Sequence, residues 1–271
     1  MENVKKKHPV LILLLCLVTA FSFIPVANLL GMFLSALFAA TNAGWLKWLL
    51  QAEGVDRFDS LRCLVMIIPA VLIYRRLRKK SEPGTVHWSL AKGSAYGILA
   101  GVGFNGISFL WIQFAEKFLS GIEWIRNSLG AMNGATLSGE RLFWLLLAAG
   151  ILVPLLEELL FRGIIFSLLE KIKKGWFAVI VSALLFALAH INPVQIVYTF
   201  IMGLISGLIY YKTKDLRWTI LMHMVINILS TFAEPEYMHT YLSAWNLFTV
   251  VMIVPVVFLV VRLLRPSEKK A

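Results

Sequence analysis

A small set of side chains inside apolar stretches of the sequence has the types and spacings that chemistry requires. Polar and ionisable groups at membrane depth cost several kcal/mol unless they are paired or face a wet cavity, so each one is a functional candidate. Three stretches carry them, namely VPLLEELLFRG, FALAH and HMVIN. The candidates are Glu157, Glu158, Arg162, Phe186, His190, His223 and Asn227.

The two adjacent glutamates are expected to have different roles. Glu158 and Arg162 are four residues apart and share one face of a helix, so an intramembrane salt bridge is the simplest interpretation of that pair. Glu157 points about 100° away around the same helix, on a face that carries no cation. A carboxylate without a partner and away from water holds its proton more tightly, which suits a general base near neutrality. The alternative for Glu157 is a carboxyl hydrogen-bonded to a neighbouring helix.

The two histidines and the asparagine lie at depths that let them meet the glutamates. At about 1.5 Å per residue, Glu157 and His190 are each about 20 Å from the cytoplasmic ends of their helices. His223 and Asn227 are one turn apart, about 10 to 15 Å into their helix. Pro193 breaks the chain just after His190, where irregular backbone is tolerated only if it lines protein or water. Acid, base and amide can therefore share one chamber within the membrane.

The composition places these groups in a membrane protein. Of the 271 residues, 59% are hydrophobic and 15% charged, and the mean hydropathy is +0.78, which does not fit a soluble surface. The net charge of +11 lies in short clusters between apolar blocks, which indicates topology, so we predict no nucleic-acid partner. Cys16 and Cys63 lie in apolar surroundings without a CxxC, so neither a disulfide framework nor a thiolate metal site is expected.

We predict an all-α, polytopic transmembrane bundle of about eight spans, with both termini cytoplasmic. Because 18 of the 26 Lys and Arg residues fall at boundaries on one side, the positive-inside rule supports this topology. A short interfacial helix is expected over 44–51, a mixed-charge loop over 115–140, and an acidic turn with Glu234 and Glu236. The expected spans cover about 9–40, 61–74, 90–114, 142–169, 176–190, 194–211, 218–232 and 244–261.

The chain divides into three parts by the position of its polar motifs. Residues 1–140 are N-terminal membrane helices without a recognisable signature, 141–232 hold all the candidates, and 233–271 form the last span and a basic tail. GxxxG sequences at Gly97 to Gly101 and Gly203 to Gly207 are more typical of close helix packing within one chain than of dimerisation.

Together the motifs resemble a known family. EELLFR fits an EExxxR signature, FALAH fits FxxxH and HMVIN fits HxxxN, in that order and on separate helices. The chain resembles the CAAX protease and bacteriocin-processing (CPBP, or Abi) family of intramembrane endopeptidases. The resemblance covers about 70 residues, from 157 to 227.

This resemblance implies peptide-bond hydrolysis within the membrane. By motif position, Glu157 would activate the attacking water, with His190 ordering or sharing it. His223 and Asn227 would donate hydrogen bonds to the tetrahedral oxyanion. Glu158 and Arg162 would hold Glu157 in position, and Phe186, the first residue of FxxxH, would support the site.

Cofactor use stays open between two mechanisms. Glu157, His190 and His223 could bind Zn²⁺ with an open fourth position. The sequence has no HExxH, and Asn227 makes a better oxyanion donor than a zinc ligand, so we favour direct activation by the glutamate without a cofactor.

Other functions compete with the protease. A transporter or proton relay would use the same Glu, His and Arg groups, although we find no inverted repeat. A non-catalytic role in bacteriocin self-immunity, or docking of a partner, would leave Glu157 dispensable. As a protease, the chain would act on a membrane-associated peptide or a lipidated protein. Its compact loops suggest a bacterial plasma membrane, while the endoplasmic reticulum stays open, and the sequence gives no indication of the oligomeric state.

Overall fold

The fold is helical throughout the part of the chain that the structure describes. The computed structural model describes residues 8–50, 54–79, 82–131, 139–232 and 244–265, and every regular element among them is a helix. The all-α prediction is therefore confirmed. The basic N-terminus, the turn with Glu234 and Glu236 and the tail from 266 lie outside the described residues.

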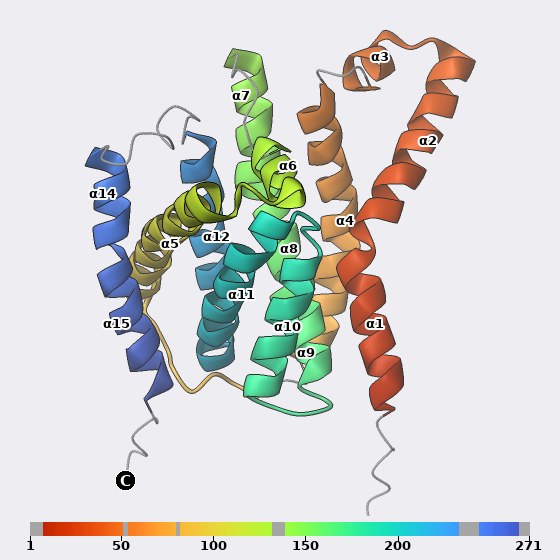
Figure 1. The fold of residues 1–271 in the computed structure, drawn as a ribbon. Coiled ribbons are helices and arrows are strands. Elements are labelled where there is room, and N and C mark those ends of the chain that lie inside the picture. The colour runs from red at the N-terminus through yellow and green to blue at the C-terminus, as the bar shows by residue number, and fades with distance from the viewer. Residues whose placement is uncertain (1–7, 51–53, 80–81, 132–138, 233–243, 266–271) are drawn as a thin grey trace, which may run out of the picture.

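Most of the helices lie side by side and run along one common direction (Figure 1). The ends of α1, α4, α9 and α15 that adjoin the basic clusters lie at the same end of this bundle, as the expected topology requires. In chain order the helices are α1 (Pro9–Phe21), α2 (Phe23–Thr41), α3 (Gly44–Leu50), α4 (Val55–Arg78), α5 (Leu90–Leu119), α6 (Glu123–Ala131), α7 (Gly139–Leu145), the π-helical η2 (Leu146–Leu152), α8 (Val153–Glu158), the π-helical η3 (Leu159–Ile165), α9 (Phe166–Leu169), α10 (Trp176–Leu188), α11 (Pro193–Thr213), α12 (Leu216–Thr231), α14 (Ala244–Val251) and α15 (Ile253–Leu264).

Several of these helices have the length and apolarity of membrane spans. Within the described residues, four qualify: Leu90–Leu119, Gly139–Leu169, Pro193–Thr213 and Ala244–Leu264. The pair α1 and α2 makes a fifth if it is counted as one span. A polytopic membrane fold is thus supported, while the number of eight spans and the cytoplasmic placement of the termini stay predictions.

The first expected span is bent. We predicted one tilted helix over about 9–40, but α1 and α2 meet at an angle of 47°. Pro25 lies at the start of α2 and has no N–H to donate to the carbonyl four residues earlier, which is the usual cause of such a break.

The expected loop over 115–140 is largely helical where the structure describes it, so that prediction was wrong there, and residues 132–138 of it lie outside the described residues. Helix α5 continues to Leu119, and α6 follows over Glu123–Ala131. The reason is burial, because Ile125 of α6 packs in a small apolar cluster with Ile112, Ala115 and Val194. The prediction of a short helix over 44–51 is confirmed by α3.

Both GxxxG sequences bring helices of this chain close together, as predicted. A Cβ at Gly203 would lie 2.8 Å from the Cα of Ala183 in α10, so α10 and α11 touch through their backbones there. At Gly101 a Cβ would lie 2.7 Å from Val225 of α12. These contacts join α10 to α11 and α5 to α12, the helices that carry or flank the candidate residues.

The helix that carries both glutamates is irregular on either side of them. Pro154 cannot donate a backbone hydrogen bond, and the preceding turn has the wider π pattern, in which the N–H of Val153 donates to the carbonyl of Ala148. A second π segment, η3, follows Glu158. The six residues of α8, which include Glu157 and Glu158, are therefore a short α-helical piece between two π-helical ones, a geometry that is frequent at functional sites.

Candidate active site

The predicted salt bridge between Glu158 and Arg162 is present and fully buried. Nη1 of Arg162 lies 3.1 Å from Oε1 of Glu158, and both side chains are 0% exposed. Nη2 of Arg162 also donates to the carbonyl of Gly203 in α11 at 3.4 Å. This pair therefore joins the span 139–169 to α11 and keeps one compensated charge pair inside the protein.

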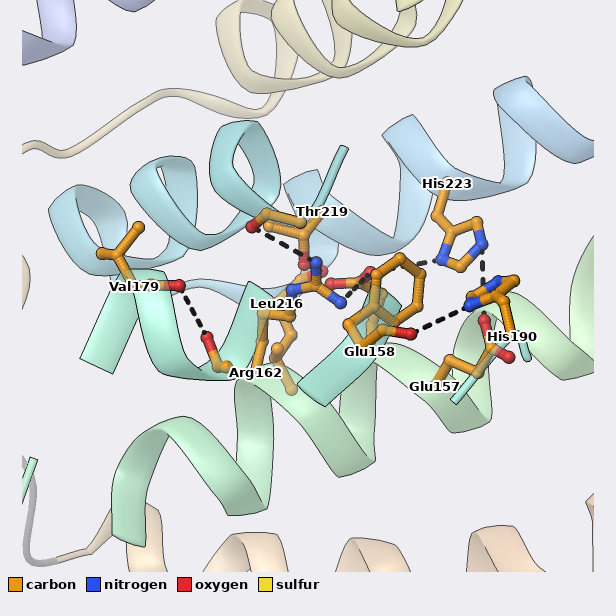
Figure 2. A network of polar contacts seen from close by, with 11 residues as sticks. Glu157, Glu158, Arg162, Val179, His190, Leu216, Thr219 and His223 are labelled. Carbon is orange, nitrogen blue, oxygen red and sulfur yellow. Dashed lines mark hydrogen bonds and ion pairs between the residues drawn. The ribbon is translucent and has the colours of Figure 1, made fainter. Parts of the chain in front are cut away.

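His223 of α12 lies between the two glutamates. Its Nδ1 is 3.2 Å from Oε1 of Glu158, and its Nε2 is 3.6 Å from Oε2 of Glu157. Figure 2 shows these two contacts leaving opposite nitrogens of one imidazole ring. The carboxylate of Glu158 only accepts hydrogen bonds, so Nδ1 of His223 carries the proton and Nε2 faces Glu157.

Glu157 differs from Glu158 in its access to the surroundings. Its side chain is 19% exposed, whereas that of Glu158 is inaccessible. We expected Glu157 to have no partner, because only its own helix could be considered from the sequence. The structure brings His223 to it from α12 instead, at a distance of 3.6 Å, which is too long for a direct hydrogen bond.

Phe186 is the apolar centre of the cluster. Its ring lies edge to face with His190, with 4.8 Å between the ring centroids, and with His223, with 5.8 Å between them. The guanidinium of Arg162 lies 4.5 Å from the same ring. A single buried phenylalanine of α10 thus contacts both histidines and the cation of the salt bridge, and excludes water from that side.

His190 lies at the end of α10, where the chain turns. Its Nδ1 is 2.9 Å from the carbonyl of Phe186. A carbonyl only accepts, so Nδ1 is the protonated nitrogen and Nε2 is left with a lone pair. This is the tautomer that can order a water molecule or take up a proton at Nε2.

Asn227 is one turn from His223 on α12, and its amide is attached to the neighbouring helix. Its Nδ2 donates to the carbonyl of Ala149 in η2 at 2.8 Å. That carbonyl lacks its usual backbone partner, because Val153 donates to Ala148 and the next residue is Pro154. Asn227 thus supplies the hydrogen bond that the proline cannot make, and no contact with Glu157 is observed for it.

The proposed zinc ligands do not have the arrangement of a metal site. No group of three or more His, Cys, Asp or Glu side chains in the described parts of the chain could hold a metal ion. The Nδ1 atoms of His190 and His223 face acceptors within the protein, so Nε2 is the nitrogen of each ring that is available to a ligand. The side chains Glu157, His190 and His223 are thus not grouped as three metal ligands in this structure, and the choice between the glutamate and the zinc mechanism stays a prediction.

The sequence analysis expected all seven candidates in one chamber; the structure brings six of them into contact, leaves Asn227 on the Ala149 carbonyl, and adds two contributors that were missed. One is the Gly203 carbonyl, which binds Arg162 and whose only signal was the GxxxG sequence. The other is Asn192, next to the His190 turn, whose signal was its position just before Pro193 at a helix start.

Comparisons with known proteins agree with this geometry. Residues 139–229, which include all seven candidates, match the family described as type II CAAX prenyl endopeptidase Rce1-like. This establishes the earlier resemblance. Residues 139–229 are therefore similar to the family that the three motifs indicated. It is an integral membrane protein, and the match supports a membrane protease of the CAAX type.

Two bacterial proteins are similar to this chain. The "Putative membrane peptidase YdiL" of Bacillus subtilis (strain 168) is 24% identical over 207 residues, which cover 72% of this chain and 78% of that protein. The "Membrane-embedded CAAX protease MroQ" of Staphylococcus aureus (strain USA300) is 43% identical over 95 residues, which cover 32% of this chain and 38% of that protein. No solved structure matches the chain significantly.

Proposed function

We propose that the chain is an intramembrane endopeptidase that hydrolyses peptide bonds of membrane-associated or lipidated peptides, with Glu157 as the general base. The observation that carries this proposal is the His223 ring between two unequal carboxylates. Glu158 is buried and neutralised by Arg162, whereas Glu157 is partly exposed. This difference supports Glu157, rather than Glu158, as the group that exchanges a proton with a water molecule.

The proposed reaction begins with a water molecule held by Glu157 and the Nε2 lone pair of His190. Glu157 takes one proton from this water, and the water oxygen bonds to the carbonyl carbon of the substrate. The proton then passes from Glu157 to the departing amine as the carbon–nitrogen bond breaks. The net reaction is the addition of one water molecule across the peptide bond.

His223 is proposed to stabilise the negative oxygen of the tetrahedral intermediate. The Nε2 of His223 lies 3.6 Å from the carboxylate of Glu157, on the side of the ring that faces away from Glu158. With Nδ1 bound to Glu158, a proton on Nε2 makes the ring a cationic donor to the oxyanion. Glu158 and Arg162 thus act on the site through His223, and the free N–H of Asn227 is a second proposed donor.

We propose that no metal ion takes part, which is supported by the arrangement of Glu157, His190 and His223, since they are not grouped as three metal ligands. The substrate class is inferred from the description of the matching family, a type II CAAX prenyl endopeptidase, and from the name of the Staphylococcus aureus relative, a CAAX protease. A bacterial plasma membrane with both termini in the cytoplasm is the proposed location, and the two bacterial relatives support it.

The test is cleavage of a quenched, prenylated peptide and of a membrane-peptide library by protein in proteoliposomes. Glu157→Gln should lower kcat by about 10² to 10⁴, the usual contribution of a general base. Glu140→Gln, at a carboxylate whose side chain is 62% exposed, is the matched control and should keep full activity. Chelation should leave the rate unchanged. Cleavage that survives Glu157→Gln would refute the role of this residue, and loss of cleavage with a chelator that Zn²⁺ restores would establish the metal mechanism.

A further inference from the structure

The turn that follows His190 has a strained backbone. Ile191 has φ +62° although it is β-branched, and it is 65% exposed, so apolar burial does not hold it there. The N–H of Asn192 donates to the carbonyl of His190 at 2.6 Å, which closes a three-residue turn around Ile191. Positive-φ turns of this kind are rare, and they persist only where the surrounding structure determines them strongly.

The side chain of Asn192 holds this turn in place. Its Oδ1 accepts hydrogen bonds from the N–H groups of Val194 and Gln195, at 3.0 and 3.2 Å, and so caps the N-terminus of α11. Its Nδ2 donates to the carbonyl of Ser128 in α6 at 3.1 Å. One amide therefore ties the turn to two helices at once.

Helix α6 is itself held firmly at this point. Ser128 is buried, Ile125 packs against Val194, and Nε1 of Trp111 in α5 donates to the Val194 carbonyl at 2.9 Å. Helix α6 packs against both α5 and α11. The first turn of α11, α6 and α5 thus form one block, to which the turn is attached through Asn192.

We propose that Asn192 is a positioning residue for His190, and that α6 sets the place of this histidine through the hydrogen bond between Asn192 and Ser128. The inference rests on the proposed function of His190. The imidazole is fixed on one side by the carbonyl and ring of Phe186, and its backbone is fixed on the other side by the strained turn. A displacement of α6 would move Asn192 through its hydrogen bond to Ser128. It would then move His190, because Ile191 is the one residue between them in the chain.

Two substitutions separate the two roles of Asn192, which caps α11 and donates a hydrogen bond to Ser128. Asn192→Asp keeps an oxygen that caps α11 but removes the donor to Ser128. It should lower kcat about tenfold, with KM and the unfolding temperature close to those of wild type. Asn192→Ala removes both interactions and should lower kcat on the order of 10²-fold, as expected for a displaced catalytic group. Ser128→Ala is the matched control, because the carbonyl that accepts the bond remains, and it should leave kcat unchanged.

A third substitution tests the strain itself. Glycine adopts positive φ without steric cost, so Ile191→Gly should raise the unfolding temperature by about 2 to 4 °C. If the turn positions His190, the same change should lower kcat, because glycine frees the backbone next to the histidine. Activity and stability that move in opposite directions would support the inference, whereas an unchanged or higher kcat would refute it.

A spectroscopic measurement separates this inference from the proposed function. The imidazole signals of His190 in isotope-labelled protein in nanodiscs should shift in Asn192→Asp and stay in place in Ser128→Ala. That shift is measurable even if no substrate is cleaved, in which case the proposed function fails and the positioning inference survives. An unchanged His190 spectrum, or a kcat within twofold of wild type for Asn192→Asp, would overturn the inference.

Discussion

Removal of one partner of the buried salt bridge should be far more harmful than removal of both. With 3.1 Å between Nη1 of Arg162 and Oε1 of Glu158, the Coulomb attraction is about 5 kcal/mol at an effective dielectric constant of about 20. Arg162→Met leaves a buried carboxylate without its cation. It should therefore lower the free energy of unfolding by about 3 to 5 kcal/mol. Glu158→Gln should cost a similar amount, because it leaves a buried guanidinium.

The double variant should recover much of this loss. Methionine fills the space of the arginine stem, and the glutamine oxygen still accepts from Nδ1 of His223, so no uncompensated charge remains. A double-mutant cycle on Arg162→Met and Glu158→Gln should therefore give a coupling free energy of at least about 3 kcal/mol. Reversible unfolding in mixed micelles, followed by tryptophan fluorescence, measures each corner of the cycle.

The control cycle uses the ion pair of Arg57 and Glu140, which are also 3.1 Å apart but with the Glu140 side chain 62% exposed. Solvent screening should hold its coupling to about 1 kcal/mol or less. If the costs at Arg162 and Glu158 simply add, or if both cycles give the same coupling, then burial is not what makes the central pair strong and the reasoning fails.

The remaining predictions concern close packing, titration and an unsatisfied carbonyl. Gly203→Ala should destabilise the protein by about 1 to 3 kcal/mol because its Cβ meets backbone of α10, whereas Gly207→Ala, with side-chain contact at 3.3 Å, should cost less than about 1 kcal/mol. Burial lowers the pKa of Lys214 despite its ion pair with Glu170, so the unfolded chain binds that proton more tightly and stability rises with pH up to the ordinary value of 10.5. Thermal unfolding of wild type relative to Lys214→Met should show this rise, and a flat difference would contradict it. Asn227→Ala should cost about 1 to 3 kcal/mol in unfolding experiments by leaving a buried carbonyl without a partner, and a neutral effect would argue against that contact.

The features that the sequence predicted well are local ones. Long apolar blocks fixed the approximate positions of the helices, because a span needs length and apolarity that can be read along the chain. The pairing of Glu158 with Arg162 was likewise accessible, since residues four apart share a helix face whatever else surrounds them.

The features that the sequence could not predict depend on how helices dock. No pattern indicated that His223 would lie between Glu157 and Glu158, since that depends on the rotation of α12 against α8. The helix α6 was missed because its charged residues gave it the composition of a loop, while its stability comes from packing of Ile125 against α5 and α11. How two helices dock depends on the side chains that each presents to the other, and the spacing of apolar residues along one helix does not specify this.

Asn227 shows how a backbone defect can determine the residue type of an active site. Pro154 deprives the Ala149 carbonyl of a donor, and one N–H of the Asn227 amide replaces it. An amide has two N–H groups, so the second is left for a substrate oxygen. A hydroxyl offers one donor and a carboxylate none, so neither could serve both positions. The asparagine of the HxxxN motif therefore fits two requirements at once: it stabilises the π segment next to the glutamates, and it provides the proposed oxyanion donor.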